Sequence, residues 1–192
     1  MTIHLITNNK DKARIYNDFF ADTMFCVRCI PNEWPEIQAD KGIDIAKATL
    51  QHYASVYPND ILVREDHSLY LDALFPFPGP YMSYFDKNMS VNTLLSIMES
   101  KTPRTGYFEL ATVVRFPNGL SFDYSHHVQI SVAKEAKGHS GNWDKVLVLE
   151  GENMSFSEKA DARIEAKTHI WNVNVQKLKR DIENYYRVHN DA

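Results

Sequence analysis

The chain has 192 residues, of which 44% are hydrophobic and 24% charged, and its formal net charge is −4 at pH 7. These values fit one globular domain, or a domain with an added lobe, that is long enough to bury a sizeable core. The charge gives no overall basic surface of the kind that duplex DNA or acidic membranes favour, so neither a nucleic-acid polymer nor a membrane is the expected partner.

The N-terminal third alternates strands and helices. Apolar runs and helical spacing predict, in order, a strand at 2–7, a helix at 10–21, a strand at 24–30, a helix at 43–57 and a strand at 61–66. The first strand ends in Thr7, Asn8 and Asn9, which are turn and helix-capping residues. Pro58 ends the second helix. This alternation predicts an α/β fold with a mixed or parallel sheet.

The rest of the chain is richer in strands. After a proline-rich turn, FPFPGPY, the sequence predicts a helix at 91–100, a long hairpin at 105–134 around the turn PNG, and a short strand at 145–151. Apolar residues at helical spacing predict a last helix, with Ile170, Leu178 and Ile182 on one face. No repeat or linker interrupts the sequence, so we expect residues 1–192 to form a single domain.

Cys26 and Cys29 form a lone CVRC motif within the second expected strand. The spacing is that of a redox pair or of half a zinc site, but there is no second cysteine pair, and three-residue spacing in a strand points two side chains to opposite faces. We therefore expect two reduced thiols in or near a core strand.

Polar residues follow two of the expected strands, and ligands of open α/β sheets bind at the carboxyl ends of strands. The first group, Thr7 to Lys12, lies where a strand meets a helix N-terminus, which favours an anion such as phosphate. A lysine at such a place is more often simply solvated.

The second group is the adjacent pair Glu65 and Asp66, beside the buried run ILV. A buried carboxylate needs a cation, a hydrogen-bond partner or water. The pair could cap the strand or pair with Arg64 and lysines, but together with Glu33 and Glu36 of the acidic loop it also suggests Mg²⁺ bridging to phosphate.

Several segments together give the chain a resemblance to a known family. The segments TNNKDK, PEIQADKGIDIAKATLQHY, EDHSLYLDALFPFPGPY, SGNWDKVLVLEG and SFSEKADARIEAKTH occur in the order, and nearly the spacing, of the inosine triphosphate pyrophosphatases, the Ham1-like enzymes. The block from Glu65 to Tyr81 is the most specific part. The resemblance covers most of the chain.

The resemblance implies an elongated mixed β-sheet flanked by helices, with two lobes and a nucleotide cleft between them. It implies a Mg²⁺-dependent, usually dimeric enzyme that hydrolyses inosine-type and xanthosine-type nucleoside triphosphates to the monophosphate and pyrophosphate. The absence of an 18-residue apolar run and of a leader-like start makes the cytoplasm the expected location.

Matching positions carry the family's roles to this chain. The resemblance assigns phosphate or nucleotide binding to seven residues: Thr7, Asn9, Lys12, Trp143, Asp144, Lys167 and His169. It assigns a metal site to Glu36, Glu65 and Asp66, and catalysis to Asp66, which would orient or deprotonate the attacking water, together with Lys47. His67 is a candidate for tuning Asp66, although strand alternation can point it away.

The departures from the family gather where it recognises the base. The stacking aromatic of the family is Gly141 here, and the arginine near the purine is Ile170, with Arg163 or Lys167 as displaced substitutes. A site that loses hydrogen-bond donors loses discrimination, so we expect an altered base preference. The alternatives are a catalytically weak nucleotide-binding protein on the same fold and a pyrimidine-directed enzyme of the related Maf-like group.

Overall fold

A computed structural model of the chain describes residues 2–164 and 168–190, and gives only the backbone for residues 168–171 and 190. The elements that position the site are β1 (Thr2–Ile6), α1 (Lys10–Phe20), β2 (Cys26–Ile30), α2 (Gly42–Val56), β3 (Ile61–Leu71), β4 (Pro78–Gly79), α3 (Met82–Asn88) and β5 (Thr105–Arg115). The remaining ones are η1 (Asp72–Leu74), α4 (Val91–Met98), β6 (Ser121–Val132), η2 (Trp143–Lys145), β7 (Leu147–Leu149), α5 (Phe156–Asp161) and α6 (Thr168–Asn190).

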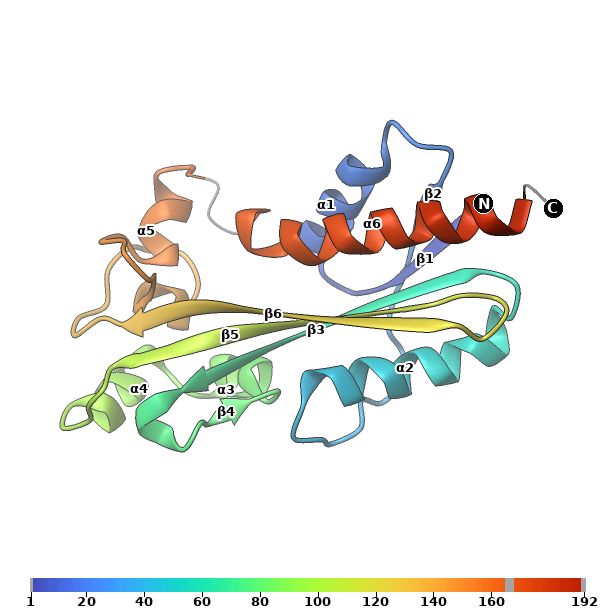
Figure 1. Ribbon diagram of the computed structural model, residues 1–192. Coiled ribbons are helices and arrows are strands. Elements are labelled where there is room, and N and C mark those ends of the chain that lie inside the picture. The colour runs from blue at the N-terminus through green and yellow to red at the C-terminus, as the bar shows by residue number, and fades with distance from the viewer. Residues whose placement is uncertain (1, 165–167, 191–192) are drawn as a thin grey trace.

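One mixed sheet runs through the molecule in the order β2-β1-β3-β5-β6-β7, with β4 paired to β3. Strands β1, β2 and β3 are parallel, whereas β3, β5 and β6 form a long antiparallel meander. These three long strands connect two lobes, one built around α1, α2 and α6 and the other around α3, α4 and α5 (Figure 1). The expected fold, an elongated mixed sheet flanked by helices, is confirmed.

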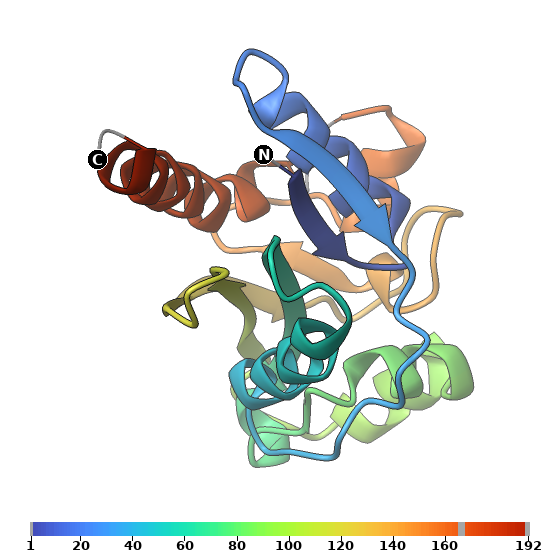
Figure 2. The same ribbon diagram turned by 90° about the vertical axis from the view of Figure 1, so that its right-hand side faces the viewer.

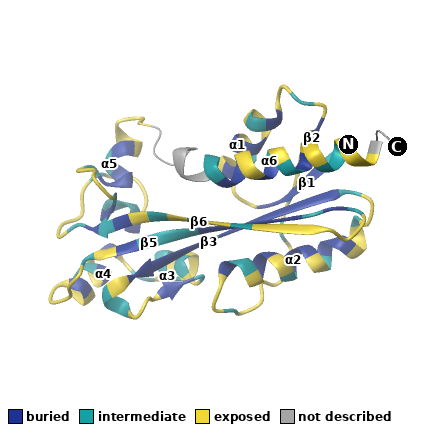
Figure 3. Cartoon of the chain, viewed as in Figure 1, coloured by how far each residue is buried: buried dark blue, intermediate teal, exposed yellow. Residues whose placement is uncertain are grey.

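Helices cover both faces of the sheet near its parallel end. Helices α1 and α6 lie on one face and α2 on the other, as the two views together show (Figures 1 and 2). The larger core contains Ile15 of α1 and Leu178 of α6, and the smaller core contains Leu50 of α2. Helices on both faces leave β3 buried almost from end to end, as Figure 3 shows, although the middle of the strand carries the polar residues 64–68.

Most expected elements are confirmed, and the main difference is the length of β3. The sequence predicted a strand that ends at the acidic pair, but β3 continues to Leu71, so Glu65 and Asp66 lie in its middle. The reason is that Leu69, Tyr70 and Leu71 pair with β5 and are buried. Helices α3 and α5 were not predicted, and a capping box at Ser155 begins α5.

The expectation of core cysteines is wrong. Both Cys26 and Cys29 are free and exposed, because β2 is the edge strand of the sheet and has a partner on one side only. Burial nevertheless raises the pKa of the Cys29 thiol. In the described part of the chain, no helix is long and apolar enough to cross a membrane.

Candidate active site

The site lies at a gap in the edge of the sheet. On one side of β3, strand β5 pairs continuously from Leu62 to Leu71. On the other side, β1 pairs only as far as Arg64, and β4 begins to pair only at Leu69. The backbone of residues 65–68 therefore has no strand partner on this edge among the described strands, and both faces of β3 can be reached through the gap.

A pocket of about 750 Å³ occupies this gap between the lobes. One end of the pocket is polar. It is lined by residues of the β1–α1 turn, the acidic loop and β3: Thr7, Asn8, Asn9, Asp11, Lys12, Asn32, Glu36, Arg64, Glu65, Asp66 and His67. Apolar residues from the other lobe also line it, namely Pro80, Met82, Phe108, Leu110 and Phe156. A volume of this size accepts a nucleotide, and its polar and apolar linings suit phosphates and a base respectively.

The turn before α1 is built by side-chain caps. The amide oxygen of Asn9 accepts hydrogen bonds from the backbone nitrogens of Asp11 at 2.8 Å and Lys12 at 3.2 Å. The Thr7 hydroxyl accepts one from the backbone of Asn9 at 3.0 Å. Asn9 therefore satisfies first-turn donors itself, and its role is to begin the helix that carries Lys12 into the pocket.

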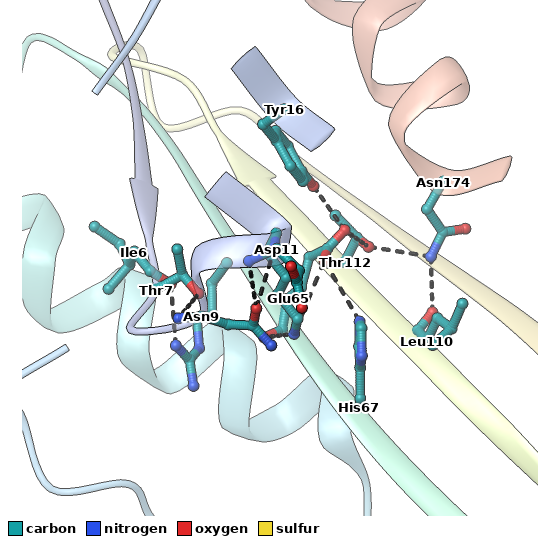
Figure 4. Close-up of polar contacts among 12 residues, drawn as sticks. Ile6, Thr7, Asn9, Asp11, Tyr16, Glu65, His67, Leu110, Thr112 and Asn174 are labelled. Carbon is teal, nitrogen blue, oxygen red and sulfur yellow. Dashed lines mark hydrogen bonds and ion pairs between the residues drawn. The ribbon is translucent and has the colours of Figure 1, made fainter. Parts of the chain in front are cut away.

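Glu65 is the centre of a buried hydrogen-bond network, drawn in Figure 4. One carboxylate oxygen accepts from the Tyr16 hydroxyl at 2.7 Å and the Thr112 hydroxyl at 3.3 Å. The other has no hydrogen bond of good geometry, but lies 3.4 Å from Nε2 of His67 and 3.9 Å from Nζ of Lys12. Lys12 also donates to the Glu65 carbonyl at 3.4 Å.

The protonation of this cluster follows from its burial. Burial alone would raise the pKa of Glu65, but the contact with His67 and the charge of Lys12 outweigh it and lower that pKa. Burial, with Lys12 nearby, lowers the pKa of His67 to about 4, and burial lowers the pKa of Lys12 as well. Near neutral pH the cluster therefore holds an ionised Glu65 and a neutral His67.

Asp66 points to the opposite face of β3, because neighbouring strand residues alternate. Its carboxylate lies beside the start of α2, where a Cβ placed on Gly42 would come within 2.5 Å of Oδ2. The Ser68 hydroxyl donates to Oδ2 at 3.3 Å. Burial raises the pKa of Asp66 to about 6, against the pull of Lys12 and Arg64. The structure thus separates the two carboxylates that the sequence placed together at one metal site.

Arg64 lies on the same face of β3 as Asp66. One guanidinium nitrogen donates to the carbonyl of Ile6, the last residue of β1, at 3.0 Å, and another pairs with the carboxylate of Glu36. The Arg64 side chain is 10% exposed and that of Glu36 48% exposed. The acidic loop is thus held over the pocket by an arginine that the sequence analysis treated only as a neighbour of the acidic pair.

Two residues expected at the site lie outside the pocket. The ammonium of Lys47 forms an ion pair with Asp123 of β6 at 2.8 Å, on an exposed part of the surface. Trp143 is 1% exposed, and its indole nitrogen donates to the Met89 carbonyl at 2.9 Å. Trp143 packs in the core and has no free ring face for a base.

Of the other residues expected to contact the nucleotide, one lines the pocket and two cannot be placed. Asp144 lines the pocket. Lys167, and the side chains of His169 and Ile170, lie outside the described residues. Gly141 has a φ of +70°, and a Cβ there would come within 2.8 Å of Asp144. An aromatic side chain at position 141 would therefore be strained in this backbone.

The residues on the Asp66 face suit a hard divalent cation bound together with phosphates. No cluster of three or more His, Cys, Asp or Glu side chains that could hold a metal is present in residues 2–164 and 168–190. Mg²⁺, however, typically binds one or two carboxylates and fills its remaining positions with water and substrate phosphate oxygens. Glu36 and Asp66, both of which line the pocket, supply such a donor set.

Sequence reasoning missed Arg64 and Asn32 as parts of the site. The Asn32 backbone donates to the Asn8 side chain at 3.1 Å, and the Asn8 amide donates back to the Asn32 carbonyl at 3.1 Å. A charged arginine inside the buried run ILVRED was the available signal, since such a residue needs partners. His67, a candidate for tuning Asp66, instead contacts Glu65.

The sequence of the chain is similar to those of a known protein family. The sequence model of the Ham1 family matches residues 3–171. A "dITP/XTP pyrophosphatase" of Pyrococcus horikoshii is 26% identical over 170 residues, covering 88% of this chain and 90% of that protein. Another "dITP/XTP pyrophosphatase", from Pyrobaculum aerophilum, is 28% identical over 159 residues, covering 82% and 84% of the two chains.

Solved structures share the fold at lower sequence identity. A HAM1 protein from Coxiella burnetii superposes with a TM-score of 0.75 at 17% identity, covering 94% of this chain and 99% of that one. The Staphylococcus aureus Ham1 protein gives a TM-score of 0.74 at 17% identity, covering 94% and 100%. At these identities the likeness establishes the arrangement of the elements.

Proposed function

The chain belongs to the Ham1 family, and from that premise we propose that it is a nucleoside triphosphate pyrophosphatase. Its substrates would be dITP-type and XTP-type nucleotides, the kind named for its relatives, and its products the nucleoside monophosphate and pyrophosphate. The observation that carries the proposal is the gap in the sheet, where Lys12, Arg64, Glu36 and Asp66 line one pocket beside a helix start.

In this proposal the polar end of the pocket holds the triphosphate. Lys12 supplies positive charge for the polyanion, and the turn from Thr7 to Asn9 fixes the start of α1 next to it. Asp66 accepts a hydrogen bond from a water molecule and orients it toward the α-phosphorus. The water oxygen bonds to that phosphorus and gives its proton to the Asp66 carboxylate, while the bond to the bridging oxygen breaks and pyrophosphate leaves with the electron pair of that bond.

Mg²⁺ is the proposed cofactor, with Glu36 and Asp66 as its protein ligands. When bound, it would neutralise phosphate charge and withdraw electron density from the reacting phosphorus. Glu65 is left out of this ligand set because its buried carboxylate is committed to Tyr16, Thr112 and Lys12 on the other face of β3.

The apolar end of the pocket would receive the base. Met82, Phe108 and Phe156 would take the place of the family's single stacking aromatic, and the carboxylate of Asp144 also belongs to the lining. A base in this pocket meets an apolar wall and a carboxylate, which supports an altered base preference. Lys167 and His169 stay predictions for this end of the pocket.

We also propose that the two lobes act as one domain and that the protein is a homodimer. A dimer, a cytoplasmic location and the absence of nucleic-acid partners are expectations from the resemblance and the composition. Gel filtration with light scattering tests the oligomeric state directly.

A catalytically weak nucleotide-binding protein is the second candidate, favoured by one observation. Lys47, which the resemblance assigns to catalysis, pairs with Asp123 outside the pocket. The deciding experiment measures pyrophosphate release from a panel of standard and deaminated nucleoside triphosphates with Mg²⁺, for the wild type and Asp66→Asn. Turnover that disappears in the variant supports the enzyme, whereas nucleotide binding without any turnover supports the binding protein.

A further inference from the structure

Arg64 is a buried cation whose hydrogen-bonding capacity is only partly used. Its Nη1 donates to the Ile6 carbonyl at 3.0 Å and its Nη2 pairs with Glu36, but its Nε is buried and has no hydrogen-bond partner in the described part of the chain. The five N–H groups of a guanidinium form a rigid planar fork that suits a phosphate. The Nε of the guanidinium is therefore unpaired, and its Nη2 is held by a single carboxylate from a loop.

The position of Arg64 is at the phosphate end of the pocket. Ile6, to which it is anchored, directly precedes the Thr7–Asn9 turn and the start of α1. Asp66 follows Arg64 by two residues and lies on the same face of β3, and both residues line the pocket. An anion at this helix start would thus lie next to the guanidinium.

The charges of the described lining residues also single out Arg64. The cationic lining residues are Lys12, Arg64 and Lys87. Lys12 already has the carboxylate of Glu65 at 3.9 Å, in a network that is buried on the other face. Lys87 belongs to α3 in the opposite lobe. Arg64 is the cation whose partner, Glu36, is half exposed and sits on a loop, so this partner can move away at little cost.

Resting on the proposed function, we propose that Arg64 binds the substrate's phosphates and that Glu36 masks its guanidinium in the free protein. A carboxylate and a phosphate compete for the same edge of an arginine, because both are anions with paired oxygen acceptors. When Glu36 turns to a divalent cation, Arg64 is released for the phosphates. One carboxylate thereby couples metal binding to phosphate binding.

The test is calorimetric binding of inorganic tripolyphosphate in the presence of EDTA, which removes the metal and the base from the measurement. Arg64→Met is expected to weaken binding by about tenfold to a hundredfold, the range for hydrogen bonds to charged groups. Arg64→Lys keeps the charge and a donor for Ile6, and should retain part of the affinity. Arg28→Met, on the exposed edge strand and outside the pocket, is the matched control.

Glu36→Gln gives an outcome with the opposite sign. Removal of the masking charge should tighten metal-free tripolyphosphate binding by about tenfold, whereas loss of a merely structural contact would weaken it or leave it unchanged. The gain should vanish in Glu36→Gln combined with Arg64→Met, because the unmasked group is then absent. A gain that persists in the double variant would overturn the proposal, since it would reflect general charge.

Thermal unfolding of each variant separates folding from binding. If Arg64→Met unfolds, Arg64→Lys and Glu36→Gln still decide the question. Equal tripolyphosphate affinity in folded Arg64→Lys and wild type, with no gain in Glu36→Gln, would reject the role of Arg64. The proposed function would survive that result if the wild type still releases pyrophosphate, and would fall separately if the wild type neither turns over nor binds any triphosphate.

Discussion

The two faces of β3 treat adjacent carboxylates in opposite ways. On the α1 face, Glu65 is enclosed by hydroxyl groups, an imidazole and an ammonium, and its pKa is lowered. On the α2 face, Asp66 has one serine hydroxyl at 3.3 Å, and burial raises its pKa to about 6. Protein groups largely compensate the charge of Glu65, although its Oε2 has no hydrogen bond of good geometry, whereas Asp66 has a single hydroxyl donor among the described residues and leaves compensation for a ligand to supply.

Strand β3 thus carries one carboxylate that serves stability and one that serves function. A buried charge that nearby protein groups compensate fixes the geometry around it, and a less compensated one costs stability unless a ligand binds it. Glu65 therefore positions Lys12 and the strand, while Asp66 faces the reaction.

Asp66→Asn should remove the carboxylate that acts on the reacting water. We expect pyrophosphate release to fall by about 10²- to 10⁴-fold, the usual contribution of a carboxylate that acts on the reacting water. The fold should persist, because asparagine is isosteric and no longer carries a costly buried charge. Steady-state kinetics with Asp22→Asn, an exposed surface change, as control measures the effect. Hydrolysis at the wild-type rate would remove the central role of Asp66.

Glu65→Gln should lower the free energy of unfolding, because Glu65 serves stability. Without the carboxylate charge, Lys12 remains buried with no anion beside it on this face, and breaking such a pair costs about 3 to 5 kcal/mol of unfolding free energy. Urea denaturation measures this loss. Glu36→Gln removes a carboxylate that is 48% exposed and screened by water, and it should cost less than about 1 kcal/mol.

The Mg²⁺ requirement of the two variants sharpens the result. Glu65→Gln should raise KM for nucleotide but leave the Mg²⁺ concentration for half-maximal activity unchanged, since Glu65 lies on the other face. A large shift in that concentration for Glu65→Gln would contradict the separation of the two carboxylates.

Gly42→Ala should disturb Asp66 without disturbing the fold. The new methyl group would come within 2.5 Å of Asp66 Oδ2, so the carboxylate must move, and small misplacements of a reacting group are costly. We expect about a tenfold loss of kcat with no loss of thermal stability, because alanine is the better helix former. Gln51→Ala, on the exposed face of the same helix, should change neither quantity.

His4, a buried histidine of β1 that packs on Tyr57, should make stability depend weakly on pH. Burial lowers its pKa, opposed by Asp60 at 3.4 Å and assisted by Arg28, and its ring packs on Tyr57. Because the unfolded chain then binds the proton more readily, stability should decrease as pH falls through the ordinary value of 6.5. Thermal melts between pH 8 and pH 5 should show this slope, and His4→Gln should have a shallower one; identical slopes would contradict it.

Periodicity predicted the long elements well because their burial is regular. The helix that became α1 and the hairpin that became β5 and β6 follow patterns that depend on local spacing alone. The extent of β3 was not predicted, since residues 67–71 join the strand through pairing with β5, which is distant in sequence. The exposure of Cys26 likewise depends on β2 being at the edge of the sheet.

Reading the chain alone was enough to predict the alternation of strands and helices, the helix start at Asn9 and a pair of adjacent carboxylates. Those features follow from local chemistry, which spacing and capping residues express directly. Contacts between distant elements set which carboxylate serves the reaction, and they pair Lys47 with Asp123 and Arg64 with Glu36. These outcomes depend on where β1 ends beside β3 and on which helix covers each face of the sheet, because a side chain's partners are set by elements far away in the chain.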